Sequence, residues 1–184
     1  ITGTLYFWEH FAGNNTHILR DYLGGYAIYS LSGGLAAVTP PITADGILLN
    51  NILNGTTLPE QYVPVGQGFF VTGSPSGGNI KFENDQRIFK KENTSEAVFF
   101  KANNENVATE DLIKRIRLKF QTPEGAIRPL LLAFTPNNLA NDDFNYGWDA
   151  INNDYFPSDM SWLIDDKNYV IQGVGEFDTS KIYP

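Results

Sequence analysis

Turn-forming residues recur along the chain, and their spacing limits the possible folds more than any other feature. Glycine, asparagine and proline divide the sequence into short stretches rich in β-branched and aromatic side chains. Such stretches suit strands, because helices need longer segments with a 3.6-residue period, and no such period persists beyond about three turns. The chain therefore predicts an all-β fold, a jelly-roll-like β-sandwich with one short helix or irregular excursion.

Eight segments are expected to form the strands of this sandwich. A further stretch, residues 39–61, is the least regular, and a short helix is expected within it at residues 47–53. A polar surface loop is expected at residues 103–111. The expected strands cover residues 4–10, 25–31, 68–72 with a hairpin partner at 79–82, 115–120, 128–134, 160–164 and 169–174.

Two of these segments predict core positions. Residues 115–120 alternate strictly between basic and apolar side chains, which predicts Ile116, Leu118 and Phe120 in the core and the basic residues in water. Residues 128–134 contain a continuous apolar run, typical of a strand buried on both faces, with Leu131 and Phe134 inside.

Composition narrows the class of protein. The 184 residues suffice for one well-buried core, and we expect residues 1–184 to form a single sandwich module, a fragment of a larger protein. A net charge of −8 disfavours nucleic acid, which needs clustered Lys and Arg. There is no apolar run long enough to span a membrane, and the lack of cysteine excludes disulfides and thiolate metal sites.

An acidic and amide-rich block near the C-terminal end, residues 141–149, is the most distinctive polar feature. Carboxylate and amide oxygens in a loop containing glycine are the ligands that Ca²⁺ takes. The block does not have the spacing of an EF-hand, so a Ca²⁺ site there would be a different kind of loop, and a plain solvated turn is the alternative. Its candidate ligands are Asp142, Asp143, Asn145 and Asp149.

The same block carries the candidate site for a sugar. Trp148 lies between Gly147 and Asp149 in the most polar stretch and is the best candidate for an exposed platform, whereas Trp162 lies in an apolar strand and is expected to be buried. Tyr146, Asn145 and Asp149 would complete a ligand site around Trp148 by stacking and hydrogen bonding.

The chain contains few of the residue types that form catalytic triads. Only two histidines and no cysteines are present, so a nucleophile–base triad is disfavoured. Carboxylate pairs such as Asp165–Asp166 would suit glycoside hydrolysis only if their separation were right, and with 21 acidic residues some pair arises by chance. We expect no catalytic residue.

Two motifs carry a family resemblance that extends over nearly the whole chain. They are Tyr6-Phe7-Trp8 and Val65-Gly66-Gln67-Gly68-Phe69-Phe70-Val71. Together they resemble the C-terminal β-sandwich region of secreted Bacteroidetes surface proteins, the cargo of type IX secretion. The resemblance implies export by the type IX machinery and an extracellular or cell-surface location, and it brings no catalytic residues with it.

Three functions are open from the sequence. We favour a non-catalytic surface module that binds polysaccharide; the alternatives are part of a secreted polysaccharide-degrading enzyme and a structural or secretion-associated spacer. A cleft with two facing carboxylates would favour the enzyme, and an exposed aromatic strip would favour the binding module.

Overall fold

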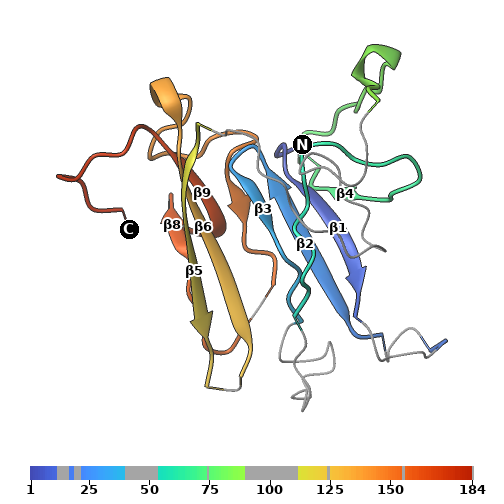
Figure 1. Cartoon of the computed structure of the whole chain (residues 1–184), viewed down its shortest axis with the longest axis horizontal. Coiled ribbons are helices and arrows are strands. Elements are labelled where there is room, and N and C mark those ends of the chain that lie inside the picture. Colours follow the sequence, from blue (N-terminus) through green and yellow to red (C-terminus); the bar gives the residue numbers. More distant parts are fainter. Residues whose placement is uncertain are drawn as a thin grey trace.

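The computed structural model is an all-β sandwich, as predicted. Two sheets of four and five strands face each other in the described part of the chain (Figure 1). Two single-turn 3-10 helices, η2 (Asn84–Gln86) and η3 (Pro136–Asn138), also occur there. The structure describes residues 1–11, 17–18, 22–39, 54–73, 75–89, 112–123, 125–154 and 156–183. The expected helix at 47–53 and the loop at 103–111 lie outside them.

The first sheet is antiparallel and has the strand order β3-β2-β1-β4. Its strands are β1 (Leu5–His10), β2 (Gly24–Ser30), β3 (Gly33–Leu35) and β4 (Phe70–Val71). The predicted hairpin between residues 68–72 and 79–82 is wrong, because Phe70 pairs with Tyr6 of β1 and residues 79–82 form no strand. Ile80 and Phe82 are exposed, so pairing of residues 68–72 with 79–82 would bury no apolar face. Pairing with β1 instead places Phe70 opposite the buried Tyr6.

The second sheet has the order β5-β6-β9-β7, with β8 also paired to β9. Its β6 and β9 strands are parallel, which the sequence did not predict, and its other pairs are antiparallel. The strands are β5 (Lys114–Gln121), β6 (Ile127–Phe134), β7 (Ala150–Ile151), β8 (Trp162–Ile164) and β9 (Lys167–Val174).

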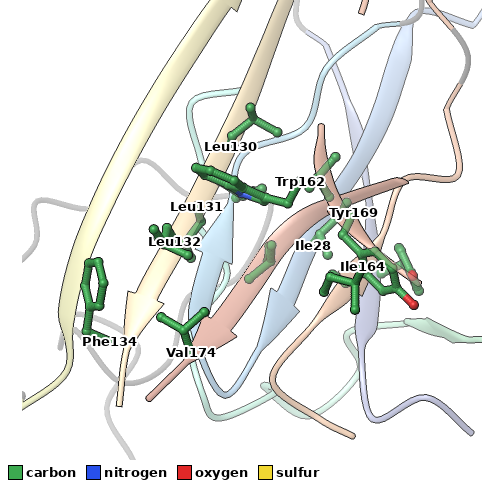
Figure 2. Close-up of a cluster of buried hydrophobic side chains, with 14 residues drawn as sticks. Ile28, Leu130, Leu131, Leu132, Phe134, Trp162, Ile164, Tyr169 and Val174 are labelled. Atoms are coloured by element: carbon green, nitrogen blue, oxygen red, sulfur yellow. The ribbon is translucent and has the colours of Figure 1, made fainter. Parts of the chain in front are cut away.

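The main core joins the two sheets. Ile28 of the first sheet belongs to the same buried cluster as Leu131 and Val174 of the second (Figure 2). Tyr6 and Ile171 are also members of this cluster. Residues 130–134 of β6 are all buried, so side chains on both faces of this strand are covered. The predictions for Leu131, Phe134 and Trp162 are confirmed.

The face assignment for β5 was wrong in part. Ile116 is 43% exposed, and Leu118 and Phe120 are only half-buried. Arg115 Nε donates a hydrogen bond to Ser32 O at 2.5 Å, and an Arg117 Nη1 donates to Gly34 O at 2.7 Å. Arg117 and Lys119 are exposed, as predicted for the basic residues, whereas Arg115 is half-buried. Because β5 ends the sheet order, its two arginines can also reach carbonyls of the β2–β3 hairpin.

No helix in the described ranges combines the length and apolar character needed to cross a membrane.

Candidate functional site

The acidic block at residues 141–149 folds into a loop that closes on itself. The Asn145 side chain is its centre: Oδ1 accepts from Asn141 N at 3.0 Å, and Nδ2 donates to Asn141 O at 2.9 Å and to Asp143 O at 2.5 Å. Asn145 N donates to Asp149 Oδ2 at 2.5 Å. The polar residues that predicted ligand binding therefore largely satisfy one another.

Asp149 is buried and joins this loop to both sheets. Its Oδ1 accepts a hydrogen bond from Gly173 N of β9 at 2.7 Å, while its backbone carbonyl accepts from Thr4 Oγ1 beside β1 at 3.1 Å. Burial raises the pKa of Asp149 to about 6, although the donors Gly173 and Asn145 act in the opposite direction. The arrangement makes Asp149 a structural connector.

The predicted Ca²⁺ ligands are not brought together as a cluster. Asp142 forms an ion pair with Lys181, Asp143 is exposed, and both oxygens of Asp149 accept protein hydrogen bonds. Across the residues that the structure describes, no group of three acidic or histidine side chains is placed to hold a metal ion. The geometry gives the calcium prediction little support, and it stays a prediction.

The predicted sugar platform is also incomplete. Trp148 is half-buried, and its Cβ lies so close to Gly173 that a side chain there would approach it to 2.9 Å. Its carbonyl accepts from Ser30 Oγ at 2.9 Å. Tyr146 is exposed, and Asn145 and Asp149 are joined by their hydrogen bond. The four residues are thus neighbours in a connecting loop.

A cleft that the sequence did not predict lies between the first sheet and the segment after β7. Its volume is about 280 Å³. We call it the aromatic cleft. Its lining residues are Tyr6, Tyr26, Ile28, Phe70, Val71, Thr72, Asn153 and Asp154.

Three exposed aromatic side chains continue the apolar side of the cleft onto the surface, and we call them the aromatic platform. Trp8 is 39% exposed, Tyr26 37% and Phe70 60%. Trp8 and Tyr26 meet edge to face with centroids 5.1 Å apart, and Tyr26 meets Phe70 in the same way at 5.6 Å. These contacts hold the rings in place while leaving much of their surface available.

Strand register explains why these rings gather. Tyr6 and Trp8 are two positions apart on β1 and so share a face. Trp8 is paired with Tyr26 of β2, and Tyr6 with Phe70 of β4, so the partners project from that same face. The three consecutive aromatics of residues 6–8 were a visible signal in the sequence, but only the pairing of β1 with β2 and β4 brings the rings of the platform together.

Polar groups line the other side of the cleft. The Tyr6 hydroxyl is buried beside the side chains of Thr72 and Asn153, and among the described residues it has no hydrogen bond of good geometry. Burial raises the pKa of Tyr6, so the hydroxyl keeps its proton at neutral pH. Asp154 adds a carboxylate and the exposed Asn153 an amide.

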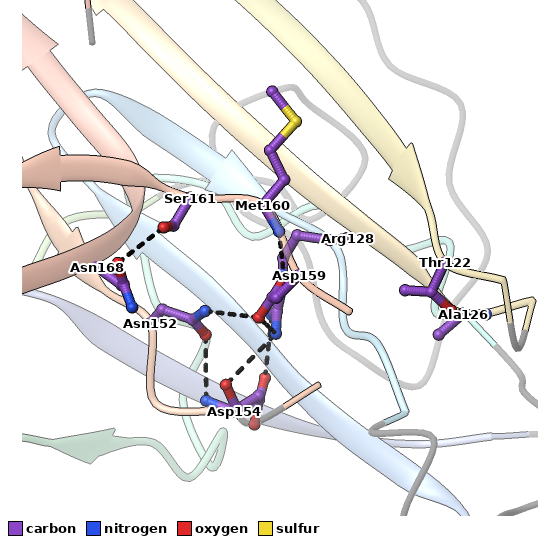
Figure 3. Close-up of polar contacts among 9 residues, drawn as sticks. All are labelled: Thr122, Ala126, Arg128, Asn152, Asp154, Asp159, Met160, Ser161 and Asn168. Atoms are coloured by element: carbon purple, nitrogen blue, oxygen red, sulfur yellow. Dashed lines mark hydrogen bonds and ion pairs between the residues drawn. The ribbon is translucent and has the colours of Figure 1, made fainter. Parts of the chain in front are cut away.

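A buried arginine supports the Asp154 side of the cleft (Figure 3). Arg128 binds Asp159 through two hydrogen bonds of 2.8 and 2.9 Å, and its Nη1 lies 3.7 Å from Asp154 Oδ2. Its guanidinium carbon also lies 3.8 Å from the centre of the Phe156 ring. Because the arginine is buried, these contacts fix both its position and that of Asp154.

The charges around Asp154 partly cancel. Burial raises the pKa of Asp154, Arg128 lowers it, and the neighbouring Asp159 raises it again. Asn152 links the two acids, because its Nδ2 donates to Asp159 Oδ2 at 3.0 Å and its Oδ1 accepts from Asp154 N at 3.2 Å. The result is an ordered polar wall facing an aromatic one.

Comparison with known proteins adds a family and no function. No curated protein and no solved structure matches the chain. One family model, described as a domain of unknown function (DUF8693), matches residues 1–184. The chain belongs to the DUF8693 family.

Proposed function

We propose that this protein is a non-catalytic module that binds polysaccharide in the aromatic cleft. The observation that carries the proposal is the aromatic platform of Trp8, Tyr26 and Phe70, which leads into a cleft lined by Thr72, Asn153 and Asp154. An exposed aromatic strip is the feature that distinguishes a binding module from an enzyme or a spacer.

The two walls of the cleft match the two sides of a sugar. A pyranose presents a face of C–H groups that packs on aromatic rings, and its hydroxyls need hydrogen-bond partners. Tyr26 and Phe70 supply the rings, whereas Asn153 and Asp154 supply a donor and acceptors. A spacer without a ligand would have no use for an exposed, ordered set of aromatic side chains, because such patches favour association.

An enzyme is less well supported by this geometry. Glycoside hydrolysis uses two carboxyl groups on either side of the bond that is cut. Of the described lining residues only Asp154 is a carboxylate, and its neighbour Asp159 is held by both of its oxygens to Arg128. The raised pKa of Asp154 would suit an acid, yet the cleft lacks a described second carboxylate to act with it.

We infer an extracellular or cell-surface location, with export by the type IX machinery. The support is the resemblance of Tyr6-Phe7-Trp8 and of residues 65–71 to secreted Bacteroidetes surface proteins. These two motifs come together in the fold, because β1 pairs with β4 and Tyr6 lies opposite Phe70. The segments that carry the resemblance therefore also build the aromatic cleft.

A glycan array probed with the whole chain tests the proposal. We expect binding to a subset of glycans, with affinity lost or lowered at least about tenfold in Tyr26→Ala and Phe70→Ala, a loss of about 1.4 kcal/mol. Phe89→Ala is the matched control, because Phe89 is a highly exposed aromatic outside the cleft. Binding to no glycan, or binding that both cleft variants retain, would reject the proposed function.

A further inference from the structure

The charge of the aromatic cleft restricts which sugars it can hold. Asp154 is the one acidic side chain among its described lining residues, and none of those residues is cationic. Arg128 lies behind Asp154, with its Nη1 3.7 Å from Asp154 Oδ2. Its side chain is 2% exposed and is bound by Asp159 through two hydrogen bonds. Its charge is already matched, and it cannot reach a ligand without leaving this pair.

The polar end of the cleft offers mainly acceptors and neutral groups. Asp154 can accept hydrogen bonds, and Asn153 can donate or accept. The Tyr6 hydroxyl is buried beside Thr72 and Asn153 and has no hydrogen bond of good geometry among the described residues. Neutral hydroxyls can satisfy all three groups. A sugar carboxylate cannot, because it only accepts hydrogen bonds and would face Asp154 with no cation between them.

We propose that the polar end of the cleft, formed by Tyr6, Asn153 and Asp154, selects glycans built from neutral or amino sugars and excludes those built from uronic acids. This inference rests on the proposed function, since it names the sugar class for the same site. Asp154 acts here as a specificity-determining residue, and Arg128 as the residue that positions it.

The expected selectivity follows from Coulomb's law. Two like charges about 5 Å apart near a protein surface repel strongly enough to weaken binding about tenfold or more. An amine in the same place would be attracted to Asp154 by a similar amount. The effect is local, so it differs from the general repulsion that a net charge of −8 exerts on any acidic polymer.

Matched oligosaccharide pairs test the inference by calorimetry. The probes are mannohexaose against hexamannuronate, galactohexaose against hexagalacturonate, and the amino-sugar hexamer of chitosan. Asp154→Asn removes the charge while keeping the shape. Asn153→Lys adds a cation at an exposed position and leaves the ion pairs of Arg128 in place. The same comparison can therefore be made with this variant if Asp154→Asn does not fold. Asp143→Asn, at an exposed loop site, controls for net charge alone.

We expect a neutral or amino-sugar probe to bind the wild-type chain and its uronate counterpart to bind at least about tenfold more weakly. Asp154→Asn and Asn153→Lys should reduce or reverse this ratio of the two affinities, and Asp143→Asn should leave the ratio unchanged. Equal binding of the matched probes, or a ratio that neither cleft variant alters, would overturn the charge selection while leaving glycan binding intact. Binding of none of the probes or array glycans would overturn both.

Discussion

The ring of Tyr26 meets the ring of Phe70 edge to face, with centroids 5.6 Å apart and planes at 86°, although their strands flank β1 on opposite sides. The contact therefore crosses the central strand and depends on the register of β2 and β4 against it. It joins two rings of the aromatic wall, because both of them line the cleft.

A double-mutant cycle on Tyr26 and Phe70 should measure this contact. Edge-to-face pairs contribute about 0.5–1.5 kcal/mol beyond simple burial, so the two alanine substitutions should be non-additive by about that amount in the free energy of unfolding. The cycle of Tyr26 with Phe89 should be additive, since those rings share no described contact. Additive behaviour of the first cycle would show that the pair is not formed in solution.

Arg128→Met should destabilise the fold strongly. It would leave Asp159 and Asp154 without their cation, and removing one partner of a buried ion pair costs about 3–5 kcal/mol. Denaturant unfolding measures the loss. Arg87→Met is the control and should change stability by less than about 0.5 kcal/mol, because Arg87 is exposed. Equal effects of the two substitutions would contradict the network.

Asp149 should make the fold more stable in mild acid. Its pKa is raised from 3.8 to about 6 in the folded state, so protonation favours folding. The contribution of Asp149 to the free energy of unfolding is complete below pH 4 and is lost as the pH rises through 6. Two pKa units correspond to about 3 kcal/mol at most. Thermal unfolding between pH 4 and 7 checks this.

The control for that profile is Asp149→Asn, which removes the titrating group. The asparagine oxygen can still accept the hydrogen bond from Gly173 N, but its NH₂ group would face Asn145 N, and two donors cannot bond to each other. The variant should therefore be less stable than the wild type at every pH. If Asp149 is the titrating group, the stability of the variant should depend less on pH than that of the wild type. An unchanged pH profile would assign the effect to other buried acids such as Glu9 and Asp154, whose pKa values are also raised.

Leu131→Ala and Ile116→Ala should differ sharply in stability, although both residues lie in apolar positions of neighbouring strands. Leu131 is fully buried, so its truncation should cost about 2–5 kcal/mol. Ile116 of β5 is 43% exposed, so its truncation should cost less than about 1 kcal/mol. Urea unfolding of the two variants checks the corrected face of β5, and equal costs would restore the alternation-based prediction.

Millimolar Ca²⁺ should leave the melting temperature unchanged. An ion that binds only the folded state would raise it, but the oxygens of Asp149 already accept from Asn145 and Gly173, and Asp142 pairs with Lys181. A rise with Ca²⁺ that disappears in the double variant Asp143→Ala, Asp149→Ala would instead establish the calcium site predicted from the sequence.

The candidate site shows how far local pattern can go. The sequence singled out residues 141–149, and the structure shows that they form a connecting loop. The polar groups of Asn145 and Asp149 are hydrogen-bonded to the loop itself and to β9. Composition cannot separate these roles, because the same oxygens that ligate an ion also cap backbone N–H groups. The favoured ligand class, polysaccharide, remains the proposal, at a different site.

The sequence by itself determined the all-β class, the buried strand around Leu131 and the burial of Trp162, because turn spacing and apolar runs act within a few residues. Only the tertiary structure decided the faces of β5 and the partner of β4. It also decided the assembly of Trp8, Tyr26 and Phe70, which come from three strands far apart in the chain. Register between distant strands depends on the packing of the whole sandwich, and a shift of one residue would turn every ring to the opposite face.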